Sequence, residues 1–193
     1  MDDFIYEIIE ENNIKTIKLT KYLNKKNEIF IPNKINGLSV TIIGERLFEN
    51  MENIVKISIP NNIKSIERYA FSCCKNLIDI NIPQSVTKID QHLFTNCLSL
   101  ETIFIPKSIE IIDFSMFSGC KKIKNVQIEY GITKIYTHAF LGCSDLIDIE
   151  IPESVLEADY GSFYECFGLS EKSHNRLLER FGQKIFEFWG SCA

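Results

Sequence analysis

The stretch IPQSVTKIDQHLFTNCLSLETIF, from Ile82 to Phe104, carries the pattern that decides the fold. Its apolar residues recur in the same order every 23 residues, so residues 54–168 divide into five consecutive tiles without a gap. The tiles begin at Ile54, Leu77, Leu100, Ile123 and Leu146. A fixed period of roughly 20 to 50 residues is typical of solenoids and other repeat architectures.

Three columns of the repeat are filled by nearly the same residue type throughout. The columns are Phe48, Phe71, Phe94, Phe117, Phe140 and Phe163; Met51, Cys74, Cys97, Cys120, Cys143 and Cys166; and Pro60, Pro83, Pro106 and Pro152, with Glu129 in the remaining place. A sixth, less regular tile precedes these, because Ile31-Pro32 lies five residues too early for Val40 and Phe48. We interpret KINGL, residues 34–38, as part of an expanded loop in that first coil.

Each tile predicts one turn of a coil. Leu77, Ile80 and Ile82 follow the spacing of a strand with one buried face, which the next proline ends. Val86 and Ile89 point inward again along a second extended segment. One tile alone cannot bury its apolar side chains, but stacked tiles cover one another.

The remainder of the tile predicts a tight turn. Leu93, Phe94 and Cys97 have helical or 3₁₀ spacing. The turn closes at Asn96, Gly119 or Gly142 in successive tiles, residue types that suit a positive φ angle, whereas Cys73 departs mildly from this preference.

The pattern I-P-x-S-V-x-x-I-x-x-x-A-F-x-x-C-x-x-L-x-x-I-x resembles the BspA-type leucine-rich repeat. Residues 82–104 fit it with Leu93 in place of alanine, whereas Glu129-Tyr130-Gly131 departs from it, and Ala158 and Ser162 weaken the last repeat. The resemblance covers roughly residues 31–169. It implies an α/β repeat solenoid, a right-handed superhelix with concave parallel strands and short helical or irregular convex segments. It also implies a surface or secreted protein that binds other proteins.

The segments outside the repeats are expected to cap a single structural domain. We expect a β-hairpin N-cap at 1–30, six repeats at 31–168 and a helical C-cap at 169–193. Ser170 or Ser173 would begin the C-terminal helix, which continues to about Arg180 and ends at Gly182. The aromatic residues that follow it would cover the last coil or, alternatively, form a protein-binding patch: Phe181, Phe186, Phe188 and Trp189.

The composition excludes several classes of partner. The 193 residues are 45% hydrophobic, and 21 basic against 26 acidic side chains give a net charge of −5, which argues against nucleic acid and anionic membranes. No apolar run reaches the roughly 20 residues of a membrane-spanning helix, so membrane insertion is not expected. The acidic N-terminus lacks a signal-peptide pattern, which predicts a cytoplasmic protein, or a cell-surface or secreted one if a signal was removed.

Catalytic and metal-binding patterns are not found. Five of the seven cysteines share one column and are expected to be buried, reduced thiols; Cys73 and Cys192 lie outside it and are the candidates for a thiol-based enzyme or redox sensor. His92 and His138 share a column two turns apart, too far for one metal ion, and they and His174 are expected to face solvent. We therefore predict a protein that is not an enzyme and uses no cofactor or metal.

The outward strand positions are the expected binding surface. They vary from tile to tile, and Phe104 is a large apolar residue at the middle tile, with Tyr130 just past the next strand. The predicted contact residues are Asn81, Thr102, Phe104, Gln127 and Tyr130. The sequence thus predicts a protein–protein interaction module, adhesin-like or scaffold-like, that is monomeric; the alternative is a structural protein that assembles through its aromatic C-terminus.

Overall fold

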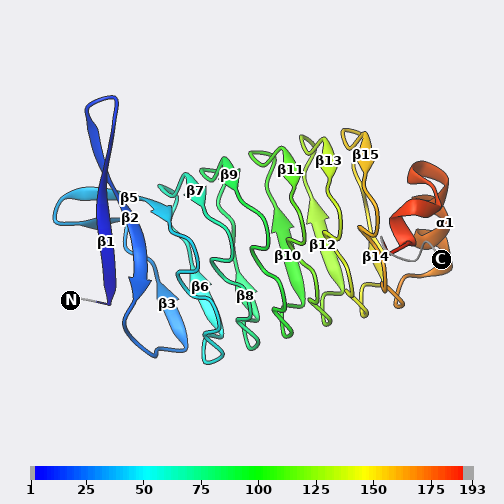
Figure 1. Ribbon diagram of the computed structural model, residues 1–193, viewed down its shortest axis with the longest axis horizontal. Helices are drawn as coiled ribbons and strands as arrows, with labels where there is room; N and C mark the ends of the chain where they lie inside the picture. Colours follow the sequence, from blue (N-terminus) through cyan, green and yellow to red (C-terminus); the bar gives the residue numbers. More distant parts are fainter. Residues whose placement is uncertain (1–2, 189–193) are drawn as a thin grey trace.

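A computed structural model describes residues 3–188 and shows an elongated stack of coils between two different caps (Figure 1). The hairpin and the first coil contain β1 (Phe4–Glu11), β2 (Ile14–Tyr22), β3 (Glu28–Phe30), β4 (Lys34–Ile35) and β5 (Leu38–Ile43). The regular coils contain β6 (Lys56–Ser58), β7 (Ser65–Ile66), β8 (Asp79–Ile80), β9 (Lys88–Ile89), β10 (Thr102–Ile105), β11 (Ile111–Ile112), β12 (Asn125–Ile128), β13 (Lys134–Ile135), β14 (Asp148–Ile149) and β15 (Glu157–Ala158). The chain ends in α1 (Glu171–Phe181) and the 3₁₀ helix η1 (Gln183–Phe186).

Two parallel ladders run along the stack, as the repeat predicts. One joins β3, β6 and β8 and then β10, β12 and β14; the other joins β5, β7 and β9 and then β11, β13 and β15. Register partners in the regular coils are 23 residues apart, as for Phe104 and Gln127. Both ladders are interrupted between the third and fourth coils, where the turns keep the stack continuous: His92 N–H donates to Phe114 O at 2.9 Å.

The core is a column of stacked phenylalanine rings. All six are fully buried, and neighbouring rings lie 5.2–5.8 Å apart and within 14° of parallel. Each ladder thiol donates a hydrogen bond to the phenylalanine carbonyl of the preceding coil, at 3.0–3.2 Å. The repeating Phe-x-x-Cys therefore unites packing with satisfaction of a buried polar group.

The turns contain two left-handed positions where the sequence indicated one. The predicted column adopts positive φ, for example 59° at Asn96 and 74° at Gly119. A second column does the same at Tyr69, His92 and His138, with φ of 58°, 59° and 61°. The predicted helical or 3₁₀ segments are hydrogen-bonded turns in which residue i donates to residue i−3.

The N-terminal hairpin is an integral part of the stack. Asn12 and Asn13, both with positive φ, connect β1 to β2, and β2 pairs in parallel with β5. The rings of Phe4 and Tyr22 pack on Phe48 and so continue the aromatic column. Residues 34–38 form the expanded loop that was expected, as an antiparallel pairing of β4 with the start of β5.

The C-terminal helix begins and ends as predicted. The Ser170 hydroxyl accepts a hydrogen bond from the Ser173 N–H at 3.2 Å, which selects Ser170 over Ser173 as the N-cap. Gly182, with φ of 78°, ends the helix. In the KIFEFW segment, the residues up to Phe186 belong to the helical turn η1 and Glu187 and Phe188 follow it in non-helical conformation; Trp189 lies outside the described residues.

Candidate functional site

We define the strand face as the outward-facing residues of the first ladder. They form two columns: Glu28, Lys56, Asp79, Thr102, Asn125 and Asp148; and Phe30, Ser58, Asn81, Phe104, Gln127 and Glu150. Strand alternation places these side chains opposite the buried ones, as in β10, where Thr102 and Phe104 are exposed and Ile103 and Ile105 are buried. The same backbone that builds the core therefore displays the face.

Four of the five predicted contact residues lie on this face. Thr102 and Phe104 project from β10, and Gln127 is the register partner of Phe104 on β12. The Phe104 side chain is 41% exposed. Asn81 follows β8, one coil earlier, and Tyr130 lies just beyond β12 with 73% of its surface exposed. The structure thus brings Thr102, Phe104 and Gln127 together, whereas Tyr130 follows β12 outside the strand face.

Phe30 is an exposed aromatic residue of the same face that the sequence analysis missed. β3 pairs with β6 so that Phe30 opposes Ser58, which puts it in the column of Phe104, three coils away and 70% exposed. At about 4.8 Å per coil the two rings lie about 14 Å apart. The match of Ile31-Pro32 with Ile59-Pro60 indicated the alignment of Phe30 with Ser58. The five extra residues of the first coil placed Phe30 outside the 23-residue period, so this alignment was not used.

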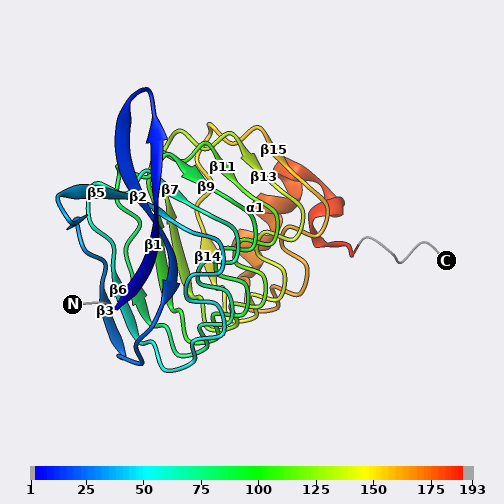
Figure 2. The same cartoon turned by 60° about the vertical axis from the view of Figure 1, so that its left-hand side comes forward.

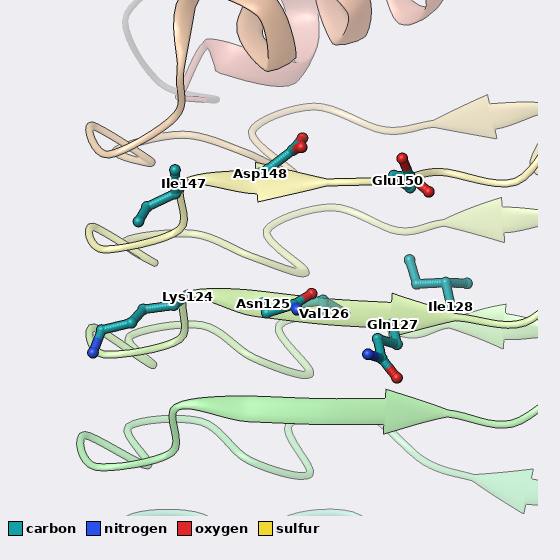
Figure 3. Close-up of a pocket in the computed structure, with 8 residues that line it drawn as sticks. All are labelled: Lys124, Asn125, Val126, Gln127, Ile128, Ile147, Asp148 and Glu150. Atoms are coloured by element: carbon teal, nitrogen blue, oxygen red, sulfur yellow. The ribbon is translucent and has the colours of Figure 1, made fainter.

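A shallow hollow of about 460 Å³ occupies the C-terminal part of the strand face (Figure 3). Its lining is Lys124, Asn125, Val126, Gln127, Ile128, Ile147, Asp148 and Glu150. Figure 3 shows that β12 contributes the amides of Asn125 and Gln127, and that the chain of β14 contributes two carboxylates. The hollow has hydrogen-bonding groups on both walls and an apolar side chain, Ile147, at its edge.

Ion pairs between neighbouring coils neutralise much of the charge on and beside the strand face. Lys56 pairs with Asp79 at 2.6 Å, and the hydrogen bond from the ammonium to this carboxylate raises the pKa of Lys56. Arg176 of α1 pairs with Asp148 at 2.8 Å. The pKa of Asp148 is lowered by the hydrogen bond from Ser173 and by the charge of Arg176. The exposed aromatic rings remain the most distinctive groups of the face.

The buried cysteines of the repeat are structural residues of the core: Cys74, Cys97, Cys120, Cys143 and Cys166. Burial raises the pKa of Cys74 and of Cys166 to about 12, so the thiolate needed for nucleophilic attack or metal binding is suppressed. Among residues 3–188, no group of His, Cys, Asp and Glu side chains could hold a metal ion. Cys73 is partly exposed beside Ser72 and Asn96, and Cys192 lies outside the described residues.

The histidines pack against aromatic rings, and the expectation that they simply face solvent was wrong. His92 stacks on Tyr69 at 4.7 Å between ring centroids, and His138 stacks on Phe188 at 5.3 Å. Phe114 lies between the two histidines with edge contacts to both. Burial lowers the pKa of His92 and His138. His174 likewise stacks on Phe186.

With the repeat geometry established, comparison with known families identifies the chain. The sequence matches the BspA type leucine rich repeat region, in six copies, over residues 15–129 and 87–191. The protein belongs to the BspA-type leucine-rich repeat family. Together the two matched ranges extend over residues 15–191, which include all the regular coils of the stack.

Solved leucine-rich repeat structures share the fold. A leucine rich cell surface protein from Faecalibacterium prausnitzii is 30% identical with a TM-score of 0.72, over 86% of this chain and 52% of that one. The T. pallidum Leucine Rich Repeat protein, 23% identical over 96% of both chains, gives 0.73, and the pneumococcal vaccine antigen PcpA, 23% identical over 86% of this chain and 46% of that one, gives 0.69. This leucine-rich repeat chain thus spans about half the length of the F. prausnitzii protein.

Two further observations concern curated proteins and membrane-spanning helices. No curated protein matches the sequence significantly. Within residues 3–188, none of the helices has the length and apolarity needed to cross a bilayer.

Proposed function

We propose that this leucine-rich repeat protein binds another protein through its strand face, with Phe104 as the central anchor. The observation that carries the proposal is the exposure of Phe104 in the middle of a polar face, in register with Gln127 and on the same strand as Thr102. An aromatic side chain surrounded by hydrogen-bonding groups has the composition of an interface hot spot. Asn81 and Tyr130 extend the proposed contact to the neighbouring coils.

The contrast between the two sides of each strand favours a binding role for the outward side. Inward positions repeat isoleucine, valine and leucine from coil to coil, whereas the outward positions change from coil to coil. The inward residues build the core, whereas outward residues such as Thr102 and Phe104 are exposed and available for recognition. Phe30 would supply a second aromatic contact for a partner that extends along the stack towards the N-terminal cap.

An adhesin-like or scaffold-like role is the more specific form of the proposal. The F. prausnitzii relative is described as a cell surface protein and the pneumococcal relative as a vaccine antigen. The competing proposal, assembly through the aromatic C-terminus, is disfavoured because Phe186 and Phe188 already pack on His174 and His138. Those two contacts are what a cap requires.

The proposal is tested by quantitative affinity capture from extracts of the native cell and of a host cell. Wild-type protein is compared with Phe104→Glu and with Phe167→Glu, which changes a residue that is 82% exposed in a turn away from the strand face. Both variants replace an exposed ring by a carboxylate, so equal far-ultraviolet circular dichroism and equal unfolding midpoints are expected.

We expect one protein to be enriched by wild type and by Phe167→Glu, and depleted at least tenfold with Phe104→Glu, because a buried carboxylate at a hot spot costs several kcal/mol. Equal enrichment by all three proteins would place the contact elsewhere and refute the strand face. Loss with Phe167→Glu alone would move the site to the turns.

A further inference from the structure

The two ends of the stack differ in how their terminal strand edges are covered. At the C-terminal end, Arg180 of α1 donates hydrogen bonds to the carbonyls of Ile151, Pro152 and Val155 at 2.6–2.8 Å. The N–H of Phe163 donates to Ile185 O in η1 at 2.9 Å. The cap thus satisfies backbone groups that a further coil would otherwise have bound.

The N-terminal end leaves a long strand edge without such a cover. β1 pairs with β2 on one side, and within residues 3–188 no strand pairs with its other side. Figures 1 and 2 show the β1–β2 hairpin at the N-terminal end, with a tip that projects beyond the coils, and the β4–β5 ribbon beside it. β1 contains no proline and no lysine, its charged residues are Glu7, Glu10 and Glu11, and Ile8 in its middle is 56% exposed. Charged residues on an edge disfavour pairing where like charges meet, so the register decides whether these glutamates block it.

We propose that β1 is a self-association edge, which pairs with β1 of a second copy of this chain in an antiparallel ladder whose two-fold axis passes through Ile8. Such an axis, perpendicular to the sheet, keeps each residue on its own face. The residues that oppose one another must therefore be an even number of positions apart along β1.

The charges of β1 select this register. With the axis at Ile8, Ile8 opposes its own copy, and Glu7, Glu10 and Glu11 oppose apolar or aromatic residues: Ile9, Tyr6 and Ile5, respectively. Moving the axis to residue 7 would place two Glu7 side chains opposite each other, and moving it to residue 9 would oppose Glu7 with Glu11. Like charges directly opposite are destabilising, so the two alternative registers are disfavoured.

Strand β2 offsets part of the acidic charge of β1, at Glu10, whereas the Lys18 opposite Glu7 forms its ion pair with Glu67 at 2.8 Å. In the hairpin register, Glu7 opposes Lys18 and Glu10 opposes Lys15 on β2. The Lys15–Glu10 ion pair measures 3.8 Å. The pairing of β1 with β2 is regular from Tyr6 to Glu11, so the segment around Ile8 is a straight template for a further strand.

This association would join two stacks end to end and leave Phe104 accessible on both. It is independent of the proposed function, because the strand face belongs to the first ladder and β1 belongs to the sheet that continues through β2, β5, β7 and β9. It also departs from the monomer expected from the sequence.

Size-exclusion chromatography with light scattering, over a dilution series of the full chain, tests the proposal. We expect the wild-type mass to rise towards twice that of the chain as concentration increases. The variant Ile8→Lys is expected to stay monomeric, because pairing would place the ammonium groups of the two copies directly opposite each other at the axis. Ile14→Lys, at a 65% exposed position of β2 away from the open edge, is the matched control and should behave as wild type.

An equimolar mixture of Ile8→Lys and Ile8→Glu provides the decisive arm. Neither variant should associate alone, whereas the mixture should regain the dimer mass because opposite charges then meet at the axis. A wild-type chain that is monomeric at every concentration would overturn the proposal. So would a dimer that Ile8→Lys leaves intact, or a mixture that fails to associate.

Discussion

At the residue scale, the fold depends on contacts between residues of the same type in neighbouring coils. Phe94 lies between Phe71 and Phe117 at centroid distances of 5.4 and 5.5 Å, and it is fully buried. Because every ring serves both neighbouring coils, removing one ring weakens two interfaces. The columns of phenylalanine and cysteine are therefore the physical basis of the repeat.

Phe94→Ala is expected to lower the free energy of unfolding by about 3–5 kcal/mol, because it opens a cavity in the middle of the ring column. Urea denaturation followed by circular dichroism measures the change. Phe167→Ala is the control at an exposed ring and should change stability by less than about 0.5 kcal/mol. A loss at Phe94 no larger than the control's would show that the stack is not the core.

The buried thiols are expected to make the protein sensitive to alkali. Because the pKa of Cys74 is about 12 in the fold and near 9 otherwise, its thiol stays protonated in the folded chain while the unfolded chain ionises. The stabilising contribution is complete below pH 9 and is lost as pH rises towards 12, at about 1.4 kcal/mol per pH unit for each such thiol.

Urea denaturation across this pH range, with wild type and Cys74→Ala, measures the effect. The variant loses packing at every pH, so the slopes rather than the absolute stabilities are compared, and the variant should show the shallower decline. Identical slopes would mean that Cys74 ionises equally in the folded and unfolded chains, which its burial does not allow.

At the scale of elements, the caps replace hydrogen bonds that a further coil would make. The α1 helix positions Arg176 and Arg180 one turn apart so that their guanidinium groups reach carbonyls of the last coil. A guanidinium group offers several donors in a fixed plane, which suits a row of unpaired acceptors. The helix is thus fitted to the strand edge by chemistry as well as by its buried Leu177.

Arg180→Met is expected to destabilise the last coil selectively, by about 1–3 kcal/mol, because three carbonyls lose their donor while the aliphatic packing is kept. Hydrogen exchange read by mass spectrometry should show faster exchange in residues 146–168 than in the central coils. Lys172→Met, at an exposed position of the same helix, is the control and should leave exchange unchanged. Unchanged exchange in Arg180→Met would show that water replaces the guanidinium without cost.

Sequence periodicity was sufficient for the coils, the ring column, the hairpin and the helical cap. It was insufficient where a position is fixed by backbone geometry rather than by side-chain type. The column that contains Arg46, Tyr69, His92, Ser115 and His138 shares a left-handed φ but not a residue type, so its common backbone role could not be predicted from the sequence. Ser115 occupies this column between the two histidines, and the ring of the preceding residue, Phe114, contacts both His92 and His138.

The residues of the strand face could be predicted from the sequence only in the regular coils. Columns in the regular tiles could be aligned directly, so the positions of Thr102, Phe104 and Gln127 followed from the repeat. Phe30 did not, because the inserted loop shifts numbering but leaves the spatial register intact. The sequence shows the insertion as a break in the 23-residue period, but only the structure shows that the strand pairing continues across it.

At the scale of the whole molecule, the stack presents one face that packing does not constrain and one end whose edge is open. The face offers Phe104 and its polar neighbours, and the end offers β1. We propose that the first recognises a different protein and the second a copy of this chain. Two stacks joined through β1 would present two strand faces, so a partner with repeated sites would be bound more tightly than by one stack.

The most direct test of the central claim is site-specific photo-crosslinking from the strand face. A benzophenone-bearing amino acid replaces Phe104 in one protein and Phe167 in another, and both are irradiated in extracts that contain the captured partner. We predict a covalent adduct with that partner from position 104 and none from position 167. An adduct from position 167 alone, or no difference between the two positions, would contradict recognition through the strand face.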